Sequence, residues 1–117
     1  MFNTFMVPFY IPGTLAANHV IEFIAPFDMQ LVHAQAHGSN ANDATLMLGK
    51  STDTDAYMAA TAIGDSDAPA EFDRNDFINS QFPHILDGEI VVLTLDFDGS
   101  SGTAAANVVI ILTFTQG

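Results

Sequence analysis

The chain has 117 residues, which is the size of one ordinary domain, and ten of them are phenylalanines. An apolar content of 49% excludes an intrinsically disordered chain, and the lack of cysteine excludes disulfides, thiolate nucleophiles and cysteine metal sites. Two basic residues against 14 acidic ones give a net charge of −12, which argues against binding to the phosphates of nucleic acid.

Short segments rich in β-branched and aromatic residues begin at the start of the chain. Apolar and polar residues alternate in them with a period of two, and this pattern predicts strands. In the second segment, for example, Ile21 and Phe23 share one face and Glu22 lies on the other. The predicted strands of the first half cover residues 2–10, 19–25, 30–37 and 45–49.

The two clearest strands are predicted near the end of the chain, at residues 89–98 and 107–115. In the last of them, every second residue from Val108 to Phe114 is apolar. Because the glycine- and serine-rich stretch 99–102 connects the two segments, we expect them to form an antiparallel pair with a loose loop.

The middle of the chain is less regular. Residues 56–63 have some helix propensity, and residues 64–88 predict long loops with one short helix near residues 73–78. No segment has the apolar spacing of a long amphipathic helix. We therefore predict one domain over residues 1–117. It should be an all-β protein with a single antiparallel β-sandwich of jelly-roll-like topology.

We expect no targeting or membrane segment. The first ten residues lack the basic start of a signal peptide, and Pro8 interrupts them. The run 108–112 is far shorter than the roughly 18 apolar residues of a membrane helix. Synthesis in a cytoplasm and no membrane partner are the resulting expectations.

The histidines raise the question of a metal site. His33 and His37 share one strand face, but on a strand they lie about 13 Å apart, which is too far for one ion to bridge. A site would need distant partners such as His19 or His84. Surface or interface histidines are the favoured interpretation. If His33 and His37 line a symmetry axis, they would make assembly sensitive to pH.

Three short acidic clusters are candidate calcium ligands. Calcium takes about six to eight oxygen ligands and tolerates irregular loops. Clusters of acidic residues without basic neighbours are therefore consistent with a calcium site. The alternative is that these carboxylates cap turns, and none of the clusters has calcium-loop spacing. No other cofactor is predicted. The candidates are Asp53 and Asp55, Asp65 and Asp67, and Asp96 and Asp98.

The sequence argues against an enzyme. It has no Gly-x-Ser-x-Gly motif and no phosphate-binding loop, since Lys50 follows Gly49 without the required pattern. No pair of carboxylates stands out as a general acid and base. Two basic residues give little support to an anionic transition state.

The distribution of charge predicts an interface instead. Residues 1–42 hold two acids and residues 99–117 hold no charge, so both ends are apolar and suited to contacts with a core or another chain. Arg74 lies among acidic residues, which favours a structural ion pair or, between subunits, a bidentate clamp on a carboxylate. The predicted interface residues are Phe2, Phe5, Phe9, Tyr10, His33, His37 and Arg74.

Several turn motifs resemble small virion proteins of tailed phages, above all head decoration (capsid auxiliary) proteins. The motifs include Ile11-Pro-Gly-Thr14, Ala25-Pro-Phe27, Gly38-Ser-Asn-Ala-Asn-Asp43, Glu71-Phe-Asp-Arg74 and Asp96-x-Asp98-Gly99. The resemblance runs over most of the chain. It implies a non-enzymatic, often trimeric subunit that binds the major capsid protein on the outside of the shell and strengthens it. The protein would be made in the host cytoplasm and reside on the virion surface.

Two other functions stay open. A calcium-dependent carbohydrate-binding module is also a small β-sandwich. Such modules display exposed aromatic rings that stack on sugars, whereas this chain has no tryptophan, and only Tyr10 and Tyr57 offer a ring with a polar tip. A subunit of another tube, fibre or cage would need the same apolar contact surfaces as a capsid protein.

Overall fold

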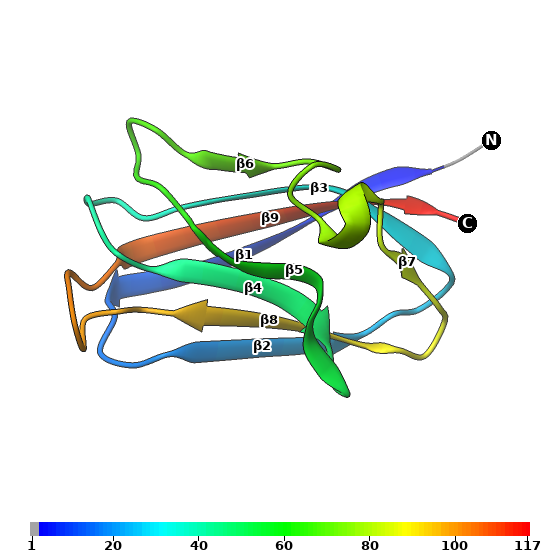
Figure 1. The fold of residues 1–117 in the computed structure, drawn as a ribbon, viewed down its shortest axis with the longest axis horizontal. Helices are drawn as coiled ribbons and strands as arrows, with labels where there is room; N and C mark the ends of the chain where they lie inside the picture. The colour runs from blue at the N-terminus through cyan, green and yellow to red at the C-terminus, as the bar shows by residue number, and fades with distance from the viewer. Residues whose placement is uncertain (1–2) are drawn as a thin grey trace.

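The computed structural model describes residues 3–117, so Phe2 lies outside the described residues. The described chain forms two antiparallel sheets that pack face to face, which confirms the predicted all-β sandwich (Figure 1). The elements are β1 (Thr4–Thr14), β2 (His19–Ile24), β3 (Met29–His37), β4 (Thr45–Lys50), β5 (Asp53–Ala62), β6 (Ala70–Phe72), the 3-10 turn η1 (Ile78–Ser80), β7 (His84–Ile85), β8 (Ile90–Asp96) and β9 (Ala106–Gln116). No helix of residues 3–117 has the length and apolar content needed to cross a membrane.

The strand order is that of a jelly roll. Sheet A has the order β1-β9-β3-β6, with β7 paired to the start of β3, and sheet B has the order β2-β8-β4-β5. When the two-residue β7 is set aside, every strand crosses to the other sheet except at the β4–β5 hairpin. This alternation is produced by two Greek keys, so the topology agrees with the jelly-roll prediction.

The predicted antiparallel pair near the end of the chain is wrong. β8 pairs with β2 and β4 in sheet B, whereas β9 pairs with β1 and β3 in sheet A. The connection over residues 97–105, orange in Figure 1, crosses the end of the sandwich, and the Ala105 N–H donates to the Phe97 carbonyl at 3.3 Å. Alternation of apolar residues predicts a strand with one buried face, but it does not say whether the next strand pairs beside it or packs across it.

β5 occupies the segment for which we expected helix propensity. Tyr57 and Met58 from this strand are buried, and β5 pairs with β4 through a register that shifts twice. Close approach of the two strands requires glycine at position 49, because a Cβ there would overlap the backbone of Thr54. Packing thus overrides the helix propensity of residues 56–63. The short helix expected near residues 73–78 is also absent from the described structure, where a turn leads into η1.

An aromatic cluster joins the two sheets along the side formed by β1 and β2. Phe114 of β9 lies at its centre, with ring centroids 5.5 Å from Phe5 and 6.2 Å from Phe23. Phe27 meets Phe5 edge-on at 5.6 Å, and Phe9 stacks on Phe23 at 6.1 Å. Pairs at these separations contribute about 0.5–1.5 kcal/mol beyond the burial of their area. The rings therefore stabilise the contact between sheets as well as the sheets themselves.

Removal of the central ring should be costly. We expect Phe114→Ala to lower the free energy of unfolding by about 3–5 kcal/mol, because the cavity lies between the two sheets. Phe82, which is 40% exposed, supplies a matched ring deletion outside the core. Urea denaturation of Phe114→Ala and Phe82→Ala checks this, and equal losses in the two variants would contradict it.

Candidate interface surfaces

The outer face of sheet A carries three of the predicted interface residues. Tyr10, Val109 and His37 lie in one row across β1, β9 and β3, and His33 lies in a second row with Met6. The residues between them in each strand point into the core. We call this surface the neutral face, because none of its twelve side chains is Lys, Arg, Asp or Glu. Its residues are Thr4, Met6, Pro8, Tyr10, Gln30, His33, Gln35, His37, Val109, Ile111, Thr113 and Thr115.

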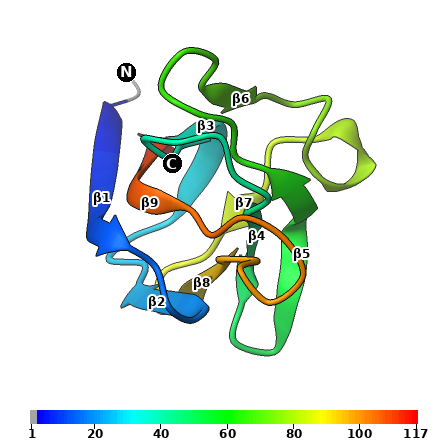
Figure 2. The ribbon, with the colours of Figure 1, turned by 90° about the vertical axis from the view of Figure 1, so that its left-hand side faces the viewer.

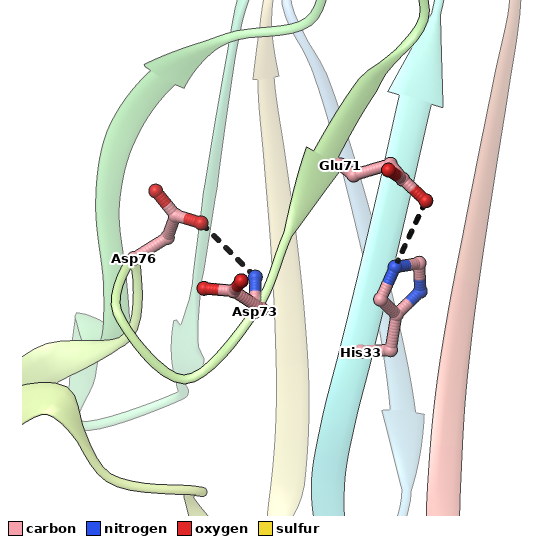
Figure 3. Close-up of polar contacts among 4 residues, drawn as sticks. All are labelled: His33, Glu71, Asp73 and Asp76. Carbon is pink, nitrogen blue, oxygen red and sulfur yellow. Dashed lines mark hydrogen bonds and ion pairs between the residues drawn. The ribbon is translucent and has the colours of Figure 1, made fainter.

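One carboxylate borders the neutral face. Glu71 of β6 lies opposite Gln35 in the register, and its Oε1 is 3.5 Å from Nε2 of His33 (Figure 3). The contact is an ion pair when the imidazole is protonated. Since the Glu71 side chain is largely exposed, the pair adds little to stability.

Phe5 and Phe9 point away from the neutral face. Their rings belong to the aromatic cluster between the sheets, where each is half-buried. The alternation of residues 5–11 already indicates this, because Phe5 and Phe9 share one face of the strand and Met6 and Tyr10 the other. The sequence analysis named Phe5 and Phe9 and did not name Met6, Val109 and Ile111, which lie on the outer face instead. The interface roles of all the predicted residues stay predictions.

Arg74 does not form the expected ion pair with its acidic neighbours. Asp76 instead accepts from the N–H of Asp73 at 3.0 Å (Figure 3). Asp73 in turn accepts from the N–H of Asn75 at 2.9 Å. These bonds form a tight turn with Arg74 exposed at its tip. Within residues 3–117 no carboxylate comes within 4.0 Å of its guanidinium, so a clamp on a second subunit stays a prediction.

The three pairs of calcium candidates lie in different parts of the chain, with Asp53 and Asp55 in β5, Asp65 and Asp67 in the connection before β6, and Asp96 and Asp98 at the end of β8. Two of their carboxylates cap turns. Asp65 Oδ1 accepts from the N–H groups of Asp67 and Ala68, both at 2.9 Å, and Asp96 Oδ1 accepts from the N–H of Asp98 at 3.0 Å. In the described part of the chain, no three His, Asp or Glu side chains lie close enough together to hold a metal ion. His19 and His84 therefore do not join His33 or His37 in such a group. Calcium binding stays a prediction.

Two of these carboxylates interact with each other. Hydrogen bonding with Asp53, followed by the negative charge of Asp53, raises the pKa of the Asp55 carboxyl. More generally, nine of the 14 acidic residues lie in connections outside the strands. The charge is therefore concentrated around the ends of the sandwich and is sparse on the two outer faces.

Lys50 stands between two shallow hollows of about 280 and 260 Å³. Tyr57 and His84 line the first hollow, and Glu89 lines the second. The Tyr57 hydroxyl donates to a Glu89 carboxylate oxygen at 3.0 Å. Burial, and then this bond and the charge of Glu89, raise the pKa of the Tyr57 phenol. Both hollows are open to solvent.

Comparisons with known proteins give one result. No family model matches the chain, and no curated protein matches its sequence. Among solved structures, a chain of the cyanophage Pam1 capsid asymmetric unit is similar over 99% of this chain and 85% of that chain. The TM-score is 0.57 and the sequence identity is 13%, so the similarity shows a shared fold. The two coverages mean that the neighbour's chain is somewhat longer than this one.

The Tyr57 phenol should ionise only above its ordinary pKa of 10.0. In the Tyr10→Phe variant it is the one remaining tyrosine, so the ultraviolet absorbance of tyrosinate reports it alone. Because the folded-state pKa is raised, its contribution to stability is fully present below pH 10 and is lost as the pH rises through the folded-state pKa. A midpoint at or below 10.0 in the folded protein would contradict this prediction.

Chelation of calcium should leave the protein unchanged. We expect the same melting temperature with excess EDTA and with added calcium chloride, because the candidate carboxylates already accept bonds from their own turns. Differential scanning calorimetry measures both conditions. A melting temperature that falls by several degrees on chelation and recovers with calcium would support the calcium-dependent binding module instead.

Proposed function

We propose that this chain is a non-enzymatic structural virion protein that forms a closed homotrimer and binds the outside of a capsid shell. The neutral face is the surface through which the copies associate. The major capsid protein is the second partner, and the role of the assembly is to stabilise the shell. The motifs shared with head decoration proteins support the choice of partner, as does the common fold with a chain of a phage capsid.

The single observation that carries self-association is the absence of charge on the neutral face. Two copies that each carry a charge of −12 repel each other at most orientations. That repulsion is smallest where uncharged surfaces meet. The core of a protein interface is depleted in charged residues, and the neutral face shares this composition. Burial of its exposed apolar side chains contributes about 25 cal/mol for each Å² removed from water.

The neutral face also has a suitable construction for a contact between copies. It is built on three paired strands, so its side chains are held by a rigid sheet. Met6 and Tyr10 project from it, while Thr113 at its centre is almost fully covered by its neighbours. A flat, rigid and uncharged surface loses little conformational entropy when a second copy covers it.

A charge on this face should dissociate the oligomer. Met6 on the neutral face is 65% exposed and Ile24 on the outer face of sheet B is 66% exposed, so they form a matched pair. We expect light scattering after size exclusion to give three times the 12.5 kDa chain mass for the unaltered protein and for Ile24→Glu. Met6→Glu should give the mass of one chain. A monomeric unaltered protein, or dissociation by Ile24→Glu alone, would overturn the proposed interface.

The virion role has a separate test. Mass spectrometry of purified phage particles should detect the protein, and mild denaturation should release it before the shell opens. Its absence from purified heads would contradict the proposal. Recovery in a tube, fibre or cage fraction would instead identify the other assembly that the same surfaces could serve.

A further inference from the structure

The two edge strands β1 and β2 lie on the same side of the sandwich, one at the end of each sheet (Figure 2). The stacked rings of Phe9 and Phe23 connect them across the interior. An edge strand presents a row of unpaired N–H and C=O groups, which is a template for the addition of another strand. The two edges differ in how far that row is interrupted.

The edge of β1 is interrupted by proline. The Gln116 N–H donates to the Asn3 carbonyl at 2.8 Å, so the odd-numbered residues of this strand direct their backbone groups to β9. Thr4, Met6, Pro8 and Tyr10 therefore direct theirs to the free edge. Proline has no N–H, so the row is broken at its middle.

The edge of β2 is open. The Ala25 N–H donates to the Glu89 carbonyl at 2.8 Å, which continues the register of β2 with β8. By the same alternation, Val20, Glu22 and Ile24 direct their N–H and C=O groups away from β8. None of these residues is a proline, their side chains are all exposed, and neither view of the ribbon shows a segment over this edge (Figures 1 and 2). β2 thus offers three successive backbone pairs to a further strand.

The charge on this edge decides what can pair with it. A second copy that paired antiparallel over the full strand would set Glu22 directly opposite Glu22, and like charges in that position are destabilising. A strand with a basic residue opposite Glu22 has the reverse effect. This chain has only two basic residues, Lys50 inside β4 and Arg74 in a tight turn, so no extended segment of it can supply one.

We propose that the free edge of β2 receives an extended strand of a different protein, with a lysine or arginine opposite Glu22 and apolar side chains opposite Val20 and Ile24. Backbone hydrogen bonds supply the affinity and the alternate side chains supply the specificity, as in other strand additions. That this partner is the major capsid protein rests on the proposed function. The sequence expected of the incoming strand rests only on the residues of β2.

A peptide tests the chemistry directly. The probe is a blocked heptapeptide that alternates threonine with valine, lysine and valine, and its control has glutamate in place of lysine. With ¹⁵N-labelled protein, we expect the lysine peptide to slow amide exchange at Val20, Glu22 and Ile24 and to leave Ile21 and Phe23 unchanged. The glutamate peptide should bind about fivefold more weakly.

Three variants distinguish strand addition from other contacts. Glu22→Pro removes the central free N–H and should abolish binding, whereas Thr4→Pro at the edge of β1 should not. Glu22→Lys should reverse the peptide preference, which keeps the test decisive if Glu22→Pro does not fold. Equal affinity for the two peptides, or protection confined to β1, would overturn the proposal. Glu22 lies away from the neutral face, so Glu22→Lys should leave the mass of the oligomer unchanged. If the peptide test fails while the protein is still a trimer, strand addition is wrong and the proposed self-association is not affected.

Discussion

The packing of the inner faces of the two sheets against each other is the interaction on which the rest of the molecule depends. There is no cysteine to cross-link the chain, and within residues 3–117 one exposed contact, between His33 and Glu71, is the whole set of ion pairs. The fold is therefore held by apolar burial around Phe114 and by the hydrogen bonds of the strands. Because side chains alternate along a strand, the choice of the inner residues also fixes the outer ones. The neutral face follows from that choice, whereas the open edge of β2 follows from the strand order of sheet B.

Most of the strands were predictable, because apolar and polar residues alternate along β1, β2, β3 and β9. The predicted limits 89–98 and 107–115 match β8 and β9 closely. Partner choice was not predictable, because Leu93 and Ile110 are buried equally well by a neighbour in the same sheet or by the opposite sheet. β5 escaped prediction because its alanine-rich run has no alternation, and it pairs only because Gly49 admits its backbone.

The candidate surfaces were predictable in part. Tyr10 was selected separately from the pair His33 and His37, and the register of β1, β9 and β3 brings all three onto one face. That register depends on long-range pairing, so no local pattern contains it. For Arg74 the local sequence was misleading. Its acidic neighbours in the sequence suggested an ion pair. The backbone N–H groups of the turn occupy those carboxylates instead.

The concentration of acidic residues in the connections has a kinetic consequence. At physiological ionic strength the field of exposed charges extends about 8 Å, so two copies that approach end to end repel before their surfaces touch. An approach through the uncharged faces avoids most of that barrier, which selects orientation during diffusion rather than after contact. Salt shortens the range of the repulsion, so the encounter rate between copies should rise with ionic strength even though the contact itself contains no ion pair. The rate of assembly of such a subunit would then depend on the ionic strength around it.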